Sequence, residues 1–364
     1  MTLHRYFARR FLWTFLGIFA IFFLFQLLLD LVDQIRRLDD DVSFGEIMHL
    51  TLLNTPEGMY QILPLVMILS AIALFVSLAR SSELVVTRAA GRSGLVALVG
   101  PLVVAVVIGG LTVAMGNPIV AATSKAYADL RESYRSGETS ALSIGKEGLW
   151  LRQSDPAGQT VIRAARANPD GTVLYDVMFV AYAEGGGPVR RIEAEEATLE
   201  AGAWKLRGAK VWPLRVGLNP EANAQVYGIL TVPSTLTEDS IKDRFGRPSA
   251  VSVWELSGYI TDLESAGFSA RRHAVWLQME LARPVFLVSM VLIGAAFTMR
   301  HSRLGGTGIA VLSAVLLGFS LYYVRNFAQI LGENGQLNAL VAAWAPPLAS
   351  VLLALGLILQ REDG

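Results

Sequence analysis

Six long apolar stretches constrain this chain more than any other feature. They cover residues 11–32, 58–79, 94–116, 284–299, 305–324 and 337–359. A helix needs about 20 mostly apolar residues to cross the roughly 30 Å of hydrocarbon in a membrane. The fourth stretch is short, but it can be extended by the apolar residues that precede it, Trp276, Leu277, Met279 and Leu281. The sequence therefore predicts six transmembrane helices.

The composition agrees with an integral membrane protein. Hydrophobic residues make up 53% of the chain and charged residues only 17%, whereas ordinary soluble domains carry about 25% charged residues. The 31 lysines and arginines balance the 31 aspartates and glutamates, so the net charge indicates no nucleic-acid or polyanion partner. The chain has no cysteine, which excludes disulfides, thiolate metal sites and cysteine nucleophiles.

The arginines near the ends of the stretches predict their orientation. The first stretch lacks a small-residue cleavage site, so we interpret it as a retained anchor and not as a signal peptide. If the N-terminus is cytoplasmic, three arginines lie on the outer short loops and nine on the inner side, Arg5, Arg9, Arg10, Arg80, Arg88, Arg92, Arg300, Arg303 and Arg361. This bias follows the positive-inside rule. Both termini are therefore predicted to be cytoplasmic, and the segment between the third and fourth spans to lie outside.

That outer segment has a different character. Turn-forming motifs such as 155–158 (DPAG) and 168–171 (NPDG) separate several extended stretches. These stretches cover residues 148–152, 159–165, 172–182, 189–199, 203–213 and 225–232. Residues 204–207 alternate between apolar and charged side chains, as expected of a strand with one buried face. We expect an all-β sandwich or jelly roll of roughly 100 residues. The predicted class is an α+β membrane protein, with this domain inserted between three spans and three spans.

One of these stretches, 173–181, carries apolar residues on both of its expected faces. Val173, Val177 and Phe179 lie on one face, and Leu174 and Met178 on the other. Such a strand either belongs to a packed core or borders an interior that holds an apolar ligand. Phe179 and Trp204 are the candidate contacts if a ligand enters.

A helical connector is expected after the β domain. Val253, Leu256, Ile260 and Leu263 recur at helical spacing, and Gly267 ends the run. A second helix then leads into the fourth span. The predicted division is 1–116 for the first three spans, 117–250 for the β domain, 251–282 for a helical connector at the membrane surface, and 283–364 for the last three spans.

A short polar interruption at 80–94 separates the second and third spans. Ser81 or Ser82 can cap a helix, Glu83 suits its N-terminus, and Gly91 can close it, which predicts a helix of about two turns at 82–91. So short a helix is marginal alone in water. It either rests in a groove of a separate cytoplasmic ATPase or lies as an amphipathic turn on the lipid surface.

Signatures of catalysis are absent from the sequence. There is no phosphate-binding loop of the Gly-x-x-x-x-Gly-Lys-Ser/Thr type, no catalytic serine motif and no grouped histidines, so we expect no catalytic residue, cofactor or metal site. The interiors of the six spans are expected to lack ionisable residues, and Asp30, Arg283 and Arg325 are expected at the span ends. Ionisable residues inside spans mark ion paths, so an ion-driven carrier is disfavoured. If the chain transports, its energy comes from another subunit.

Arg36 and Arg37 follow the first span, where lipid headgroup phosphates would lie. Arginine is suited to bidentate phosphate contact. The other interpretation is ordinary interface anchoring, partly neutralised by the acidic residues at 39–41.

Several of these segments resemble one family, the lipopolysaccharide export permeases LptF and LptG. The resemblance rests on RYFARRFLWTF at the start, LVDQIRR after span one, SSELVVTRAAG between spans two and three, EGLW in the β domain, and the segment 254–285. The VDQ and EGLW words and the pair Pro346-Pro347 are more similar to the LptG branch. The resemblance covers essentially the whole chain and implies six helices with a periplasmic β-jellyroll.

The resemblance also implies partners and residue roles. The partners would be the sister permease LptF, a dimer of the ATPase LptB, and the single-span LptC. The family's coupling helix matches the segment that contains Glu83, Leu84, Val85, Thr87, Arg88 and Gly91. Arg36 and Arg37 match a basic pair near lipid A phosphates. Asp30 departs from the pattern, because a lysine can occupy its place; either phosphate recognition there is not shared or the lipid carries fewer phosphates.

The implied function is a permease subunit of the bacterial inner membrane. It would take lipopolysaccharide from the outer leaflet and pass it through the β domain to a periplasmic bridge, driven by ATP hydrolysis in the partner. Two alternatives remain open: a permease for another lipid or lipoprotein, and a scaffold that docks periplasmic partners without transporting.

Overall fold

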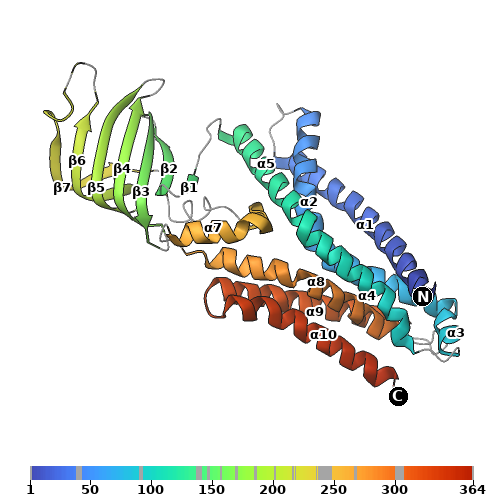
Figure 1. The fold of residues 1–364 in the computed structure, drawn as a ribbon. Helices are drawn as coiled ribbons and strands as arrows, with labels where there is room; N and C mark the ends of the chain where they lie inside the picture. Colours follow the sequence, from blue (N-terminus) through green and yellow to red (C-terminus); the bar gives the residue numbers. More distant parts are fainter. Residues whose placement is uncertain are drawn as a thin grey trace. The chain divides into compact units, whose positions relative to one another are not determined.

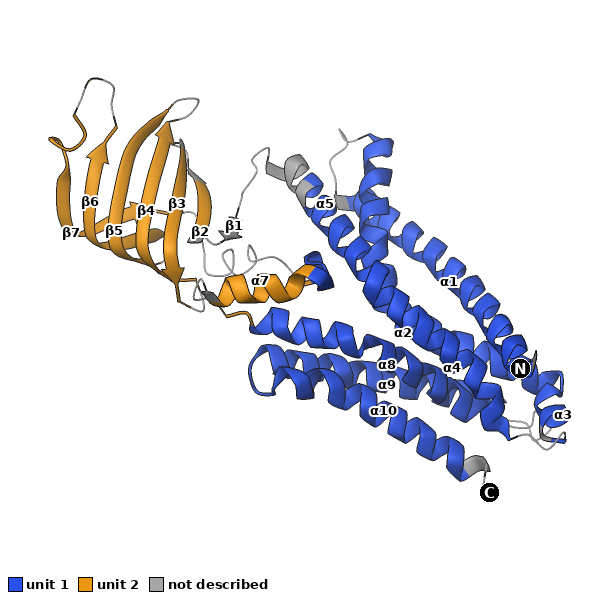
Figure 2. Ribbon diagram, viewed as in Figure 1, with its two compact units in different colours: residues 1–131, 249–254, 271–364 blue, residues 132–248, 255–270 orange. Residues whose placement is uncertain are grey.

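The computed structural model contains two compact units. It describes the chain except residues 1, 38–42, 90–92, 137–141, 146–147, 156–157, 169–170, 184–186, 201, 215–216, 218, 235, 237–247, 266–268, 300–306 and 363–364. The helical unit comprises 1–131, 249–254 and 271–364, and the β unit comprises 132–248 and 255–270 (Figure 2). Each unit has its own hydrophobic core.

Six helices of the helical unit are long and apolar enough to span a membrane, as predicted. The elements are α1 (Thr2–Arg37), α2 (Phe44–Arg80), α4 (Gly94–Leu111) with its continuation, α8 (Arg271–Thr298), α9 (Thr307–Glu333) and α10 (Ala339–Glu362) (Figure 1). The short helix α3 (Glu83–Ala89) lies between α2 and α4. A capping box at Ser43 and Glu46 begins α2 and satisfies backbone donors at its N-terminus.

The spans are longer than the apolar stretches that predicted them. After α4 a π-helical turn η1 (Thr112–Gly116) leads directly into α5 (Asn117–Ser136), so the helix continues where the β domain was expected to begin. Asn117 is polar but buried, and its Oδ1 accepts a hydrogen bond from the backbone nitrogen of Val253 at 2.7 Å. This bond satisfies its side chain within the helix. Similarly, residues 271–282, expected to form part of a connector, are the first part of α8.

Helices α2 and α8 form the centre of the helical unit. Phe75, Met67 and Phe286 are fully buried between them and their neighbours. Gly294 on α8 allows this close packing, because a Cβ there would lie 2.8 Å from the Cβ of Ala71. By contrast, α1 and α9 leave rows of large apolar side chains exposed, as expected of helices that face lipid or another membrane subunit.

The β unit is built on one antiparallel sheet of seven strands in sequence order, β1 to β7. The strands are β1 (Leu142–Gly145), β2 (Gly148–Asp155), β3 (Gly158–Ala167), β4 (Val173–Ala183), β5 (Pro188–Glu200), β6 (Ala203–Pro213) and β7 (Gln225–Pro233). Six of them match the predicted stretches, and β1 was not predicted. The α+β class with an inserted β domain is therefore confirmed. Within the described residues the sheet is a single meander and not two sheets facing each other.

A row of irregularities crosses the sheet and changes which residues face the core. Asp176 on β4 and Gly208 on β6 have positive φ angles of 53° and 63°. The strand pairing skips both residues, so the alternation of side chains slips by one position there. Leu174 therefore joins Val177 and Phe179 on the buried face, whereas Met178 lies on the opposite face as expected, so the correction concerns Leu174.

Helix α7 (Val253–Ser265) supplies the second layer that a sandwich would obtain from a second sheet. From this helix Leu263 is buried in the core of the β unit, and Tyr259 and Ile260 pack against it. Ala270, which follows the helix, is also buried there. The predicted helix near 251–265 is thus present, and part of it covers the sheet core.

Candidate functional site

The short helix α3 is attached to the N-terminal end of α1 through Glu83. The Glu83 carboxylate accepts hydrogen bonds from Arg10 Nη1 at 2.6 Å, Tyr6 Oη at 2.9 Å and Ser81 Oγ at 2.7 Å. Arg10 in turn donates from Nη2 to Ser77 Oγ on α2 at 2.9 Å. Glu83 and Arg10 therefore join α3 to the first two spans.

The electrostatics of this contact favour an ionised Glu83. Partial burial acts to raise the pKa of its carboxyl group, but the hydrogen bonds from Arg10, Ser81 and Tyr6 outweigh burial and hold the pKa below its usual value. The residue before the helix, Ser82, has a φ of 59°, which is uncommon outside glycine. A left-handed residue between α2 and α3 makes the sharp turn that directs Glu83 at α1.

The other residues that were predicted to couple to an ATPase divide between the two sides of α3. Leu84 and Thr87 are buried, whereas Val85 and Val86 are 41% and 67% exposed. Thr87 donates to the backbone oxygen of Glu83 at 2.8 Å. The side chain of Arg88 and the whole of Gly91 lie outside the described residues. Among the described side chains of α3, Val85 and Val86 thus form an apolar exposed surface, and the acidic residue Glu83 is hydrogen-bonded within the chain.

The Glu83–Arg10 contact should depend on pH. Because the folded pKa of Glu83 is lowered, its stabilisation is complete above the ordinary glutamate pKa of about 4.3 and is lost as the pH falls through the folded value. A double-mutant cycle with Arg10→Gln and Glu83→Gln, followed by thermal unfolding, should give a coupling energy of about 0.5–1 kcal/mol at pH 7. The coupling at pH 3 should be smaller. Equal coupling at the two pH values would contradict a role for the ionised carboxylate.

The basic pair after span one lies at the end of α1. Arg36 is exposed, and the side chain of Arg37 lies outside the described residues. Asp30, which precedes Arg36 by six residues on α1, is buried, and its Oδ1 accepts a hydrogen bond from Gln26 at 3.1 Å. Arg36 is therefore available to a ligand at this end of the helix, and Asp30 is turned into the protein.

Phe179 and Trp204 lie together in the core of the β unit. Phe179 is 1% and Trp204 0% exposed, and their rings meet edge to face with centroids 6.3 Å apart. The indole nitrogen of Trp204 has no hydrogen-bond partner there. The structure thus brings the two residues together in a closed core, and contact with a ligand requires that the core open.

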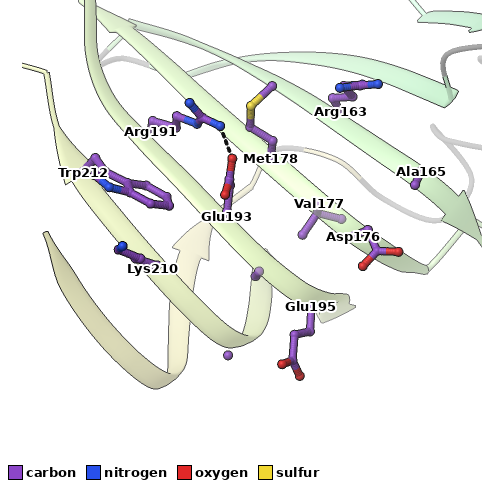
Figure 3. Close-up of a pocket in the computed structure, with 12 residues that line it drawn as sticks. Arg163, Ala165, Asp176, Val177, Met178, Arg191, Glu193, Glu195, Lys210 and Trp212 are labelled. Carbon is purple, nitrogen blue, oxygen red and sulfur yellow. Dashed lines mark hydrogen bonds and ion pairs between the residues drawn. The ribbon is translucent and has the colours of Figure 1, made fainter. Parts of the chain in front are cut away.

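The opposite face of the sheet carries a shallow hollow of about 680 Å³ with charged and aromatic lining. Figure 3 shows Arg191 paired with Glu193, and Trp212 beside Lys210. The side-chain nitrogen of Lys210 lies 4.8 Å from the centre of the Trp212 ring, and the Arg191 guanidinium lies 5.4 Å from it. These cations and carboxylates compensate one another, so the hollow has no excess charge to select a ligand.

A buried group of charges joins α2, α8 and α9, and sequence reasoning missed it. Glu280 on α8 is fully buried and accepts hydrogen bonds from Arg283 Nη2 at 2.6 Å, from Arg283 Nε at 3.1 Å and from the hydroxyl of Tyr60 on α2. Arg283 also donates to the backbone oxygen of Tyr60 at 3.3 Å. Arg325 on α9 is 7% exposed, over the ring of Phe286.

These positions correct the expectation that Arg283 and Arg325 lie at the ends of their helices. Both are interior residues of long helices, because α8 begins 12 residues before Arg283 and α9 ends 8 residues after Arg325. A signal was present in the sequence: Glu280 and Arg283 are spaced i, i+3 on a helix, as in an ion pair. The expected ends of these two helices were therefore wrong, and the depth of the two arginines in the membrane stays a prediction.

Comparison with known proteins agrees with this architecture. The family described as lipopolysaccharide export system permease LptF/LptG matches residues 5–360. The chain is 23% identical to the lipopolysaccharide export system permease protein LptG of Escherichia coli strain K12 over 339 residues, which cover 91% of this chain and 90% of the relative. It is 24% identical to the LptG protein of Haemophilus influenzae over 316 residues, 85% of each chain. The match spans all six membrane helices and the β unit, and the chain therefore belongs to the LptF/LptG family of lipopolysaccharide export permeases.

Proposed function

We propose that this chain is a transmembrane subunit of an ATP-driven exporter that extracts lipopolysaccharide from the outer leaflet of the inner membrane. The observation that carries the proposal is the attachment of α3 to α1 through Glu83 and Arg10. A helix of seven residues has too few internal bonds to transmit force alone. Its contact with α1 gives any protein that pushes on α3 a connection to a membrane span.

The exposed valines of α3 define where the motor would bind. Val85 and Val86 form an apolar surface beside the ion pair, which suits a groove on a cytoplasmic ATPase dimer such as LptB. Closure of that dimer would move α3, and Glu83 would pass the movement to Arg10 and Tyr6 on α1. The chain itself supplies no catalytic group to this cycle.

The exposed faces of α1 and α9 suit a sister permease, LptF in this family. Large apolar side chains such as Ile21, Phe25 and Leu28 on α1 and Ile309, Leu312 and Leu316 on α9 are at least 50% exposed. A cavity between two permeases would be lined by these helices. Arg36, at the end of α1, would contact an anionic headgroup there. Both termini are cytoplasmic in this arrangement.

The β unit would receive the acyl chains in the periplasm and pass them on, with LptC as the next component. Its hydrophobic core contains two large aromatic side chains, Phe179 and Trp204. The unsatisfied indole nitrogen of Trp204 is a weak point in the packing. Opening of this core would expose an apolar trough of the kind that acyl chains need.

Photo-crosslinking tests the substrate and its route. A photoreactive phenylalanine analogue at Phe179 or Trp204 should form an adduct with lipopolysaccharide in cells, because both face the proposed trough. The same analogue at Met178, on the opposite face of β4, is the matched control and should form little adduct. The adduct at Phe179 should require ATP when the assay is repeated in membrane vesicles.

Three outcomes would contradict the proposal. An adduct with another lipid or a lipoprotein at Phe179 would identify a permease of different specificity. No lipid adduct at either inner-face position, together with normal surface lipopolysaccharide after depletion of the chain, would indicate a docking scaffold. Equal adducts with and without ATP would remove the link to a motor.

A further inference from the structure

Arg325 on α9 carries a buried charge that the surrounding helices do not balance. Its guanidinium carbon lies 5.1 Å from the centre of the Phe286 ring, and Nε has no hydrogen-bond partner. The charged groups that act on it are Arg283 and Glu280, one cation and one anion. Glu280 already accepts hydrogen bonds from two nitrogens of Arg283, Nε and Nη2.

The charges in this buried group therefore sum to one excess cation. Glu280 and Arg283 neutralise each other, and Tyr60 is a neutral donor. An unpaired charge in a low-dielectric interior is strongly unfavourable unless a counter-charge approaches it. Within the described residues no second carboxylate contacts this group. An anion from outside these residues would balance Arg325.

The depth of Arg325 indicates which anion can reach it. Arg325 lies 18 residues after Thr307, the first residue of α9, or about 27 Å along the helix axis at roughly 1.5 Å per residue. The hydrocarbon layer is about 30 Å thick. Tyr60 lies 20 residues before the end of α2 at Arg80, at a similar height. The charged group therefore lies where hydrocarbon meets headgroups.

An apolar cavity lies next to the charged group, nearer to the centre of the bilayer. It measures about 110 Å³, lies between α2, α8 and α9, and is lined by residues that include Pro64, Leu65, Ile68, Met290, Val315 and Tyr322. Tyr322 is three residues before Arg325 on α9, and Gln61, also in the lining, follows Tyr60. The cavity thus extends from the charged group toward the bilayer centre. We call it the α2–α9 groove.

We propose that Arg325 binds the phosphate of a resident anionic membrane lipid, and that part of one acyl chain of this lipid occupies the α2–α9 groove. Nε and an adjacent Nη of a guanidinium form a two-donor edge that matches two phosphate oxygens. The groove supplies the apolar half of the same amphipathic ligand. The site is argued from Arg325 and the groove alone and does not depend on the proposed export function.

Binding of three probes to the full-length chain in detergent tests the site. Native mass spectrometry would compare dioleoyl phosphatidate, which has a phosphate and chains, with dioleoylglycerol, which lacks the phosphate, and with inorganic phosphate, which lacks the chains. Phosphatidate should bind at least about tenfold more tightly than dioleoylglycerol, as expected of a charge-assisted bidentate contact. Inorganic phosphate should bind more weakly than phosphatidate.

Two variants assign the two halves of the site. Arg325→Gln should bring the affinity for phosphatidate to within about twofold of that for dioleoylglycerol. Val315→Trp should fill the groove and weaken both lipids. The matched control is Arg272→Gln, which removes an exposed arginine at the start of α8 and should leave all three affinities unchanged.

Thermal unfolding measured without lipid separates a loss of lipid binding from a loss of stability in the variants. Removing an unbalanced charge should leave the midpoint of Arg325→Gln equal to or above that of the parent chain. A large fall would show that Arg325 is a structural counter-ion of Glu280 and would overturn the proposal. Equal binding of inorganic phosphate and phosphatidate would rule out the lipid. Loss of association with a second membrane subunit in Arg325→Gln, with lipid binding unchanged, would assign the anion to a partner's carboxylate.

Discussion

Replacing Glu83 by lysine is expected to abolish lipopolysaccharide export while the chain remains folded in the membrane. The substitution places an ammonium group beside Arg10, which now donates to Glu83 at 2.6 Å, so attraction becomes repulsion. Helix α3 would lose its contact with α1. Under the proposed function, membranes that contain the variant should retain ATP hydrolysis by the partner but release lipopolysaccharide at a rate at least about tenfold lower, because movement of the ATPase would no longer reach the span.

A charge swap separates two explanations of that loss. If Glu83 acts through α1, Glu83→Lys combined with Arg10→Glu should restore much of the export, because the ion pair is rebuilt with opposite sense. If Glu83 instead contacts the ATPase directly, the double variant should be as inactive as the single one. Arg9→Glu, one residue away on α1, is the matched control, because the described contacts of Glu83 involve Arg10 and Tyr6. Full export by Glu83→Lys alone would contradict any coupling role.

The sequence was sufficient for the architecture because hydrophobic periodicity is a local property. The six spans appear as apolar runs, and six strands appear as alternating segments between turns such as 168–171. Lengths were less predictable. The third span was expected to end at Gly116, before the polar Asn117, but a hydrogen bond from the backbone of Val253 satisfies the Asn117 side chain. Residues 136 positions apart make that bond, so no local pattern could predict the continuation.

The one-residue shift in which side chains of the sheet face the core could not be predicted from the local sequence either. A period of two from Leu174 onward places Leu174 and Val177 on opposite faces, whereas the positive φ of Asp176 brings them to the same face. Aspartate tolerates a positive φ angle better than most residues, but an aspartate in a strand sequence does not by itself predict that conformation. The same row continues at Gly208, where glycine is a clearer signal.

For the site as well, single residues could be selected from the local sequence, whereas their partners follow only from the fold. Glu83 could be selected from sequence because it begins a short helix in a polar loop, but its partner Arg10 lies 73 residues away and comes only from the fold. Arg283 and Arg325 were assigned to span ends because the apolar runs were shorter than the helices. Their convergence with Glu280 depends on the packing of α2, α8 and α9.

Replacing Glu280 by glutamine is expected to destabilise the helical unit by about 3–5 kcal/mol, the usual effect of breaking a buried ion pair. Glutamine keeps the size and hydrogen-bonding capacity of the side chain but removes its charge, which leaves Arg283 and Arg325 as two buried cations at one level of the bundle. Thermal unfolding of the purified chain should show a lower midpoint. Glu255→Gln, at an exposed position of α7, is the control and should stay within about 0.5 kcal/mol of the parent.

Combining substitutions shows whether charge balance is the cause. Arg325→Gln added to Glu280→Gln should recover part of the lost stability, since it removes one of the two unpaired cations. The variant with leucine at both Glu280 and Arg283 should be more stable than a variant in which only one of the two is replaced. A buried ion pair can be exchanged for apolar packing at little net cost in stability. If Glu280→Gln is as stable as the parent, or if Arg325→Gln deepens its defect, then these residues act as hydrogen-bonding groups and not as balanced charges. In that case the excess cation inferred for α9 would also be incorrect, because both conclusions depend on the same ionised Glu280 and Arg283.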